Sequence, residues 1–147
     1  MSTYKKILVA IDLSNESEKV IERAKKLAGG DCAKLHLVHV VEPIAAAYPI
    51  DAYAINVSQM QEESMQIAKE RLADIGKECG ISLSQQHIVV GSAATEIRSM
   101  VKELGADLIV IGSHGRSGWK LLLGSTANKV LHGSDCDILT VHVGERA

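Results

Sequence analysis

The chain contains no phenylalanine, and aromatic side chains make up only 3% of its 147 residues. Single-stranded nucleic acids are bound largely by stacking on aromatic side chains, so this scarcity argues against such a ligand. A formal net charge of −2 without a basic cluster argues against nucleic acids in general. We therefore expect no nucleic-acid partner.

The sequence also lacks any apolar run long enough to cross a membrane, and its first residues pass into a strand pattern without a signal sequence. Its three cysteines are far apart and odd in number, which fits a reducing compartment. None of its six histidines forms a His-x-x-x-His or His-x-Glu pattern. We expect a cytoplasmic protein with no membrane partner and no metal site.

The apolar residues that are present alternate between two patterns along the chain. Continuous or alternating runs predict strands, and apolar residues three or four apart predict helices. The expected strands are residues 6–11, 33–41, 87–90, 108–111 and 137–143, and the expected helices are 15–28, 58–79, 97–104 and 125–132. This strict alternation predicts an α/β fold with a five-stranded parallel sheet. We expect residues 1–147 to form a single domain.

Two segments between these elements have particular patterns. Residues 15–18, Asn-Glu-Ser-Glu, resemble a capping box at the start of the first helix. Residues 43–58 have no clear period and predict a long excursion, which is often functional or poorly ordered.

A glycine-rich stretch follows the fourth expected strand. It combines four glycines, three basic or titratable side chains and two hydroxyls, namely Gly112, Gly115, Gly118, Gly124, His114, Arg116, Lys120, Ser125 and Thr126. Glycines allow a ligand to approach the backbone closely, and free amides at a helix start attract phosphate. A structural turn before a capped helix is the alternative, but the combination favours an anion site.

Asp12 ends the first expected strand. In open parallel sheets, ligands bind beyond the carboxyl ends of the strands where the winding reverses, usually between strands 1 and 4. That geometry would bring Asp12 opposite the glycine-rich stretch, where its carboxylate could accept from ribose hydroxyls. A turn or helix-cap role is equally well favoured. Val40, at the end of the second strand, is a candidate wall for a base or a plain core residue.

Other nucleotide folds lack their motifs here. The P-loop pattern Gly-x-x-x-x-Gly-Lys-[Ser/Thr] is absent, and Asp12-Leu13-Ser14 stands where a dinucleotide fold would need Gly-x-Gly-x-x-Gly. No residue can be named as a general base for hydrolysis, so we predict little or no turnover.

At these residues the chain resembles the universal stress protein family, over essentially its whole length. The matching segments are Lys6–Asp12 with Ser14, His39-Val40, Asp107–Gly115, Leu121–Ala127 and Cys136–Val141. The resemblance implies an open, Rossmann-like sheet with strand order 3-2-1-4-5 and helices on both faces. It also implies a cytoplasmic role in stress response and dimerisation through the last strand.

The nucleotide-binding branch of that family carries Gly-x2-Gly-x9-Gly-[Ser/Thr] for the phosphates of ATP. Its motif positions correspond to Gly112, Gly115, Gly124 and Ser125. By the same resemblance, Asp12 and Val40 lie near ribose and adenine, and Ala10 and Ile111 neighbour the base or sugar. The nucleotide-binding residues expected from these arguments are Ala10, Ile11, Asp12, Val40, Ile111, Gly112, His114, Gly115, Arg116, Gly124, Ser125 and Thr126.

One departure separates this chain from the ATP-binding pattern, because only the eight residues 116–123 lie between Gly115 and Gly124. We predict a regulatory dimer that binds ATP or AMP, with Mg²⁺ able to accompany ATP. The alternative is a nucleotide-free dimeric stress protein that acts through protein contacts, as in a family branch with a degenerate loop.

The last expected strand, Asp137–Val143, has its own signal for association. It alternates, contains no proline and is followed by only four residues. An edge strand with free backbone groups invites pairing with a second copy across a two-fold axis. An edge covered by the tail is the alternative, and the short tail favours a homodimer.

Overall fold

The computed structural model describes residues 4–43, 54–112 and 136–142. Its strands are β1 (Ile7–Ala10), β2 (Leu35–Val41), β3 (Gln86–Val90), β4 (Leu108–Gly112) and β5 (Asp137–Val141). Its helices are α1 (Ser17–Leu27), α2 (Ala54–Cys79) and α3 (Ala93–Leu104), with short 3₁₀ turns η1 (Cys32–Lys34) and η3 (Leu83–Gln85). The helix expected at residues 125–132 lies outside the described residues.

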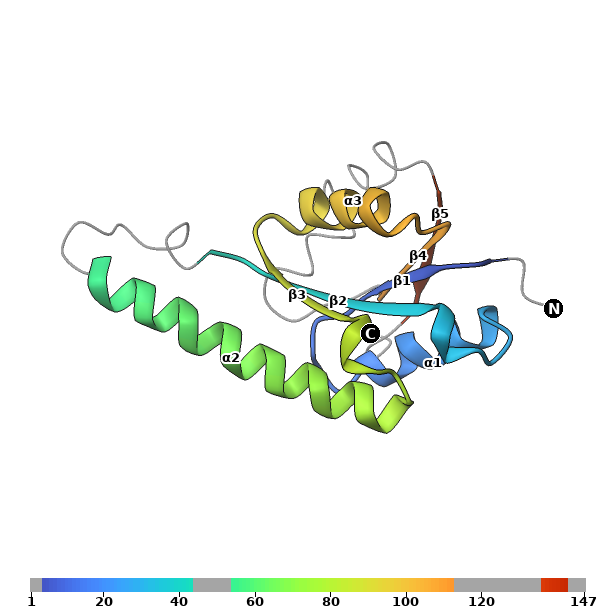
Figure 1. Ribbon diagram of the computed structural model, residues 1–147, viewed down its shortest axis with the longest axis horizontal. Helices are drawn as coiled ribbons and strands as arrows, with labels where there is room; N and C mark the ends of the chain where they lie inside the picture. The colour runs from blue at the N-terminus through green and yellow to red at the C-terminus, as the bar shows by residue number, and fades with distance from the viewer. Residues whose placement is uncertain (1–3, 44–53, 113–135, 143–147) are drawn as a thin grey trace.

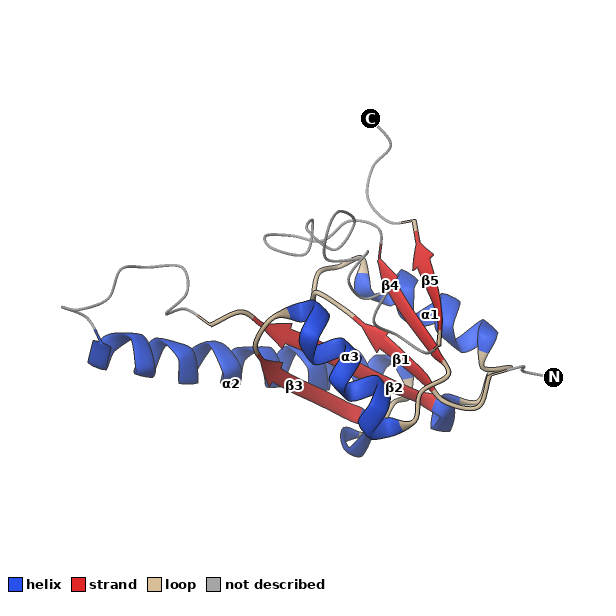
Figure 2. Cartoon of the chain, turned by 90° about the horizontal axis from the view of Figure 1, so that it is seen from above, coloured by secondary structure: helices blue, strands red, loops and turns tan. Residues whose placement is uncertain are grey.

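The five strands form one parallel sheet in the order β3-β2-β1-β4-β5. β1 is its central strand, because Ala10 pairs with Val38 of β2 on one side and Ile111 of β4 on the other. Figure 2 shows the strands running side by side in the same direction. The predicted α/β fold, strand order and parallel pairing are confirmed.

Helices cover both faces of this sheet, as expected. α1 and α2 lie on one face and α3 lies on the other (Figure 1). Side chains alternate along β1, so Ile7 and Val9 enter the core under α1 and α2, whereas Leu8 and Ala10 pack under α3. Because β1 is buried on both faces, its sequence reads as a continuous apolar run rather than an alternating one.

Residues before β1 and β4 connect three strands at their amino ends. The backbone amides of Lys5 and Lys6 donate to the Asp107 carboxylate at 2.9 and 3.0 Å. The Tyr4 hydroxyl donates to the Asp137 carboxylate at 2.7 Å, at the start of β5. These hydrogen bonds fix the register of β1 against the second half of the chain.

The predicted capping box at residues 15–18 is wrong. Glu16 occupies the N-cap position of α1 and makes no side-chain capping bond. The Ser14 hydroxyl instead accepts from the Glu16 amide at 3.2 Å, and the Ser14 carbonyl accepts from the Ser17 amide at 3.0 Å. The hydrogen bonds that close the turn before α1 therefore begin at Ser14, one residue before Asn15, where the predicted capping box would begin.

α2 begins at Ala54, four residues before its predicted start at Ser58. The four added residues, 54–57, follow no helical apolar period, so the sequence pattern did not include them. The helix has 26 residues, which corresponds to about 39 Å. Its amino-terminal end extends past the sheet (Figure 1). Within the described residues, no helix is long and apolar enough to span a membrane.

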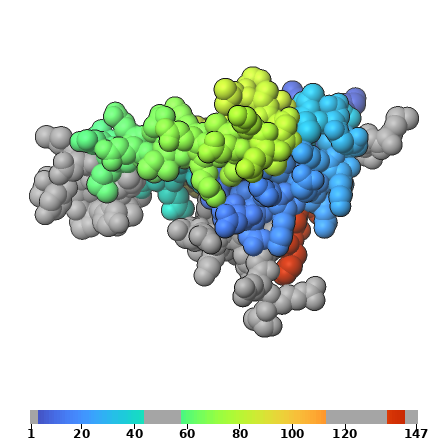
Figure 3. All heavy atoms as spheres, turned by 90° about the horizontal axis from the view of Figure 1, so that it is seen from below, coloured from blue at the N-terminus to red at the C-terminus, as the bar shows by residue number. Residues whose placement is uncertain are grey.

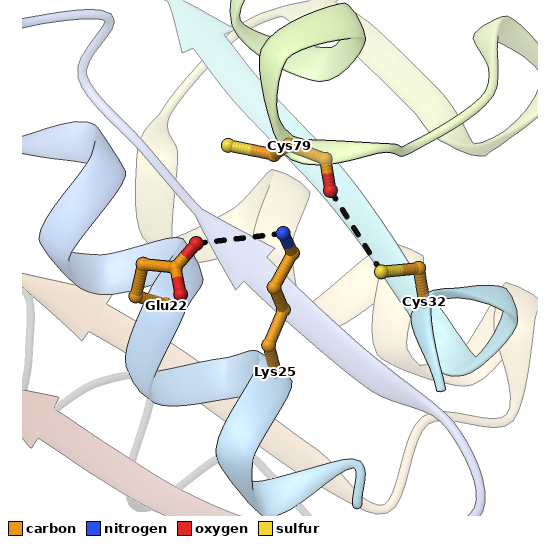
Figure 4. A network of polar contacts seen from close by, with 4 residues as sticks. All are labelled: Glu22, Lys25, Cys32 and Cys79. Carbon is orange, nitrogen blue, oxygen red and sulfur yellow. Dashed lines mark hydrogen bonds and ion pairs between the residues drawn. The ribbon is translucent and has the colours of Figure 1, made fainter. Parts of the chain in front are cut away.

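The fold brings two distant cysteines to one place at the carboxyl end of α2. The Cys32 thiol of η1 donates to the Cys79 carbonyl at 3.7 Å, and the Lys25 ammonium points toward the same region while pairing with Glu22 at 3.4 Å (Figure 4). Burial raises the pKa of the Cys79 thiol. Neither Cys32 nor Cys79 forms a disulfide bond.

A pair of histidines lies near the amino ends of β2 and β3. His36 Nδ1 and His87 Nε2 are 3.1 Å apart, and the two rings stack with centroids 5.4 Å apart. Burial is the largest cause that lowers the pKa of each imidazole below 6.5, and His87 and Lys6 lower that of His36 further. The pair therefore favours the neutral form in the folded protein.

The close approach of α2 and β3 at Gly76 yields a first prediction. A methyl group at Gly76 would overlap the Gln86 side chain and lie 3.1 Å from the Ile81 carbonyl oxygen. Overpacking costs about 1–3 kcal/mol, and alanine recovers about 1 kcal/mol of helix preference over glycine. We expect Gly76→Ala to lower the free energy of unfolding by about 1 kcal/mol in urea denaturation.

A double-mutant cycle separates this clash from a general effect on the helix. Gln86→Ala removes the side chain that the new methyl group would meet, so Gly76→Ala should cost less in that background. An equal cost in both backgrounds would show that Gln86 does not limit the space at Gly76.

The histidine pair yields a second prediction. The unfolded chain takes up protons near the ordinary pKa of 6.5, whereas the folded chain takes them up at lower pH. Stability is therefore complete above about pH 6.5 and is lost as pH falls below it. His87→Gln, which keeps an amide near Nε2 but does not titrate, should make the urea midpoint fall less between pH 7 and pH 5. An unchanged slope would contradict the assignment.

Candidate functional site

The sheet has one position where the chain reverses its direction of winding. From β1 the chain proceeds through β2 and β3 to one edge, and then returns to β4 and β5 on the other side of β1. The switch point therefore lies between the carboxyl ends of β1 and β4, which pair in parallel (Figure 2). Such a switch point is where open parallel sheets bind ligands.

Asp12 lies at this point, directly after β1. Its Oδ1 accepts from the Ser14 amide at 3.0 Å and from the Ser17 hydroxyl at 3.4 Å. Ser17 is only 1% exposed, so the carboxylate joins the loop to a buried residue at the start of α1. The structure thus shows the turn role for Asp12, whose carboxylate is half-buried after the carboxyl end of β1.

His39 supports the residue before Asp12. Its Nδ1 lies 2.8 Å from the Ile11 carbonyl oxygen, so it donates the hydrogen bond, and the Ile11 amide donates to Val38 at 3.0 Å. Burial lowers the pKa of His39, although the Ile11 carbonyl and the Asp12 carboxylate favour its charged form. This contact fixes the backbone from which Asp12 projects.

Leu13 has a left-handed backbone, with φ of 64°, and is the non-glycine residue with positive φ in the described part of the chain. The Arg71 guanidinium, from α2, reaches this loop. Its Nε donates to the Leu13 carbonyl at 2.9 Å and its Nη2 donates to the Asn15 side chain at 3.3 Å. Thus α2 contacts the loop that carries Asp12.

The apolar residues expected at the site are core residues. Ala10, Val40 and Ile111 are 1%, 2% and 1% exposed and belong to one cluster under α3. Ile11 is 2% exposed and belongs to the cluster under α1 and α2. Val40 is therefore packed as a core residue. Ala10, Val40 and Ile111 lie together near the carboxyl ends of three adjacent strands.

Only the first residue of the glycine-rich stretch is described. Gly112 is half-buried at the end of β4. The remaining expected phosphate-site residues are outside the described ranges, namely His114, Gly115, Arg116, Gly124, Ser125 and Thr126. The geometry therefore brings together the strand-end residues of the expected site and does not address its loop residues.

A groove of about 490 Å³ lies behind the Asp12 loop, between α1 and α2. Both helices line the same face of the molecule, as Figure 3 shows. The groove is lined by Ser14, Asn15, Glu18, Arg71, Asp74, Ile75, Lys77 and Glu78. The hydrogen bond and like charge of Glu18 raise the pKa of Glu78. In the described ranges, no three His, Cys, Asp or Glu side chains gather so that they could share a metal ion.

Sequence reasoning missed Arg71 and His39 as supports of the Asp12 loop. Arg71 is 58 residues from Leu13, and His39 is 28 residues from Ile11. Contacts of that separation leave no periodic pattern. The one available signal was the placement of His39 at the end of a predicted strand beside Val40.

Comparison with known sequences extends over nearly the whole chain. The family model described as Universal stress protein family matches residues 3–142. The chain is 44% identical over 147 residues to Universal stress protein A homolog 2 of Coxiella burnetii, covering 97% of this chain and 98% of the relative. It is 34% identical over 142 residues to Universal stress protein G of Shigella flexneri, covering 94% and 99%.

Solved structures agree with this result. The hypothetical protein MJ0577 is 27% identical, with a TM-score of 0.76 and coverage of 97% of this chain and 99% of that chain. A universal stress protein crystallised in complex with cAMP is 29% identical, with a TM-score of 0.59 and coverage of 96% and 98%. UspA of Lactobacillus plantarum, at 23% identity, coverage of 96% and 99% and a TM-score of 0.76, shares the fold. This chain belongs to the universal stress protein family.

Proposed function

We propose that this protein binds an adenine nucleotide, ATP or AMP, at the switch point between β1 and β4, and acts in the cytoplasm as a regulatory dimer in the stress response. The observation that carries the proposal is the position of Asp12. Its half-buried carboxylate stands at the end of the central strand, next to the strand that leads into the glycine-rich stretch. A carboxylate opposite an anion-binding loop suits a ribose phosphate.

Each part of the nucleotide has a proposed contact. The ribose hydroxyls donate to Asp12, and the adenine ring packs on the apolar strand ends formed by Ala10, Val40 and Ile111, beside the Ile11 backbone. Backbone amides and hydroxyls bind the phosphates at Gly112, Gly115, Gly124, Ser125 and Thr126, with His114 and Arg116 beside them. Mg²⁺ can accompany ATP through its phosphates and water.

The structural relative in complex with cAMP supports this choice of ligand class. That protein is 29% identical to this chain and aligns over 96% of it. Cyclic AMP contains an adenine, a ribose and a phosphate, which are the groups that the proposed site would contact. ATP and AMP share those groups, so the proposal names the class and leaves the number of phosphates to experiment.

We propose that the bound nucleotide regulates the protein and is turned over slowly or not at all. Hydrolysis needs a base within hydrogen-bond reach of the attacking water. His39 is the described imidazole beside the Asp12 loop, and its Nδ1 already contacts the Ile11 carbonyl at 2.8 Å. Burial lowers the pKa of His39. We propose that this imidazole supports the loop backbone and does not act as the base.

The eight-residue spacing between Gly115 and Gly124 favours a second candidate function. In this second candidate, one residue fewer than in the Gly-x9-Gly pattern would shift the second phosphate-binding segment relative to the first. In that case the protein would be a nucleotide-free dimer that acts through protein contacts. Nucleotide titration separates the two functions.

Calorimetric titration of nucleotide-stripped protein with ATP and AMP, with and without Mg²⁺, should show saturable binding. Asp12→Asn keeps the acceptor for Ser14 but removes the charge, so we expect its Kd to rise about ten- to a hundredfold. Gly124→Val should abolish binding, because a side chain there blocks close backbone approach to phosphate.

Asp31→Asn is the matched control, since Asp31 caps η1 through the Ala33 amide at 3.1 Å, before the amino end of β2. Its affinity should equal that of the wild type. Wild-type protein that shows no binding at millimolar ATP or AMP would contradict the nucleotide proposal and favour the second function.

We propose that the dimer forms through Asp137–Val143. β5 is an edge strand of the sheet, and Thr140, its fourth residue, is exposed. Antiparallel pairing across a two-fold axis would bring like residues of two copies close together. Unpaired edge groups would then find partners in the second copy.

Sedimentation tests this interface. Thr140→Lys places like charges close together in the dimer, so we expect monomers with an unchanged circular dichroism spectrum. Val90→Lys is the control on the opposite edge, since Val90 of β3 is 39% exposed. A dimer that persists in Thr140→Lys but dissociates in Val90→Lys would assign the interface to β3 instead.

A further inference from the structure

The loop that carries Asp12 has a partner that nucleotide-site motifs do not include. Arg71 lies on α2 and is separated from the loop by more than fifty residues of sequence. Its guanidinium makes two hydrogen bonds there, at 2.9 Å to the Leu13 carbonyl and 3.3 Å to the Asn15 side chain. Two donors of one planar group fix orientation better than a single bond does.

The Leu13 carbonyl is available to Arg71 because of the unusual backbone at Leu13. A left-handed conformation is rare for a residue with a branched side chain and persists where surrounding contacts favour it. The left-handed conformation of Leu13 turns the chain away from the direction of β1. Asp12 therefore lies between the buried Ile11 and this turn. Arg71 bonds the carbonyl of the turning residue itself.

The turn also determines where the Asp12 carboxylate lies. Oδ1 of Asp12 accepts from the Ser14 amide at 3.0 Å, on the other side of Leu13. A change in the Leu13 backbone would therefore move both ends of this hydrogen bond. The contact at Asn15 attaches the same guanidinium to the next part of the loop.

We propose that Arg71 is a positioning residue of the nucleotide site: by holding the Leu13 turn from α2, it sets the Asp12 carboxylate for the ribose hydroxyls. This inference rests on the proposed function. Arg71 itself does not touch the nucleotide. Its effect is carried by Asp12 and is confined to ligands whose ribose can donate to that carboxylate.

The test compares two ligands and two variants by calorimetry. For AMP, Arg71→Ala should raise Kd about tenfold, as expected if the Asp12 carboxylate then occupies its ribose-binding position in about a tenth of the unliganded molecules. For 2′,3′-dideoxy-AMP, which has no ribose hydroxyls to donate, Arg71→Ala should bind as the wild type does. If Arg71 served only overall folding, Arg71→Ala would raise the Kd of both ligands by the same factor. That result would overturn the proposal.

Lys77→Ala is the matched control. Lys77 lies on the same helix, lines the same groove between α1 and α2, and is exposed. This variant should bind AMP with wild-type affinity. Equal weakening by Lys77→Ala and Arg71→Ala would indicate a general charge effect of the groove and would overturn the positioning role.

A double variant tests whether Arg71 acts through Asp12. If it does, Asp12→Asn combined with Arg71→Ala should bind AMP no more weakly than Asp12→Asn alone. Additive losses would overturn the proposal. Hydrogen exchange of the peptide spanning residues 11–17 provides a readout without ligand, and it should be faster in Arg71→Ala than in Lys77→Ala.

The outcomes distinguish this inference from the proposed function. One outcome overturns only the positioning role. In it, the wild type binds AMP and Asp12→Asn binds AMP more weakly, but Arg71→Ala binds AMP with wild-type affinity. If the wild type binds no adenine nucleotide, both proposals are overturned. Arg71→Lys keeps the charge without the planar fork and should lie between wild type and Arg71→Ala.

Discussion

The pairing of β1 with strands on both sides is the constraint on which the rest of the structure depends. β1 hydrogen-bonds to β2 and to β4, and its four residues are buried on both faces. A strand so placed must be apolar throughout. The chain continues from β1 to β2 and β3 on one side, and then forms β4 and β5 on the other side. The first polar residue after it, Asp12, consequently stands where the two halves of the fold separate. The candidate site is thus a consequence of topology.

The loop after β1 is supported from three elements rather than by its own sequence alone. His39 of β2 bonds the Ile11 carbonyl, Ser17 of α1 bonds Asp12, and Arg71 of α2 bonds Leu13. Each contact restrains a different residue of one short segment. A carboxylate held in this way needs little reorganisation when it accepts a hydrogen bond from a ligand, which is the general advantage of a preorganised site.

The sequence predicted the sheet well because buried parallel strands have a distinctive composition. The run Leu108–Ile111 and the alternation of strands with helices sufficed for five parallel strands, and the family resemblance supplied their order. Features set by long-range contacts were missed, including the Arg71 contact with Leu13 and the His36–His87 pair. The capping box failed because Ser14, rather than the expected pair, bonds the start of α1. For the site, strand ends could be placed from sequence, but their supporting contacts could not.

We propose that an adenine nucleotide binds at the switch point with its ribose on Asp12. A crystal structure of the protein with AMP or ATP tests it most directly. We expect a ribose hydroxyl about 3 Å from the Asp12 carboxylate and the adenine against Val40 at the end of β2. A nucleotide bound elsewhere, for example in the groove between α1 and α2, or a ribose directed away from Asp12, would contradict it.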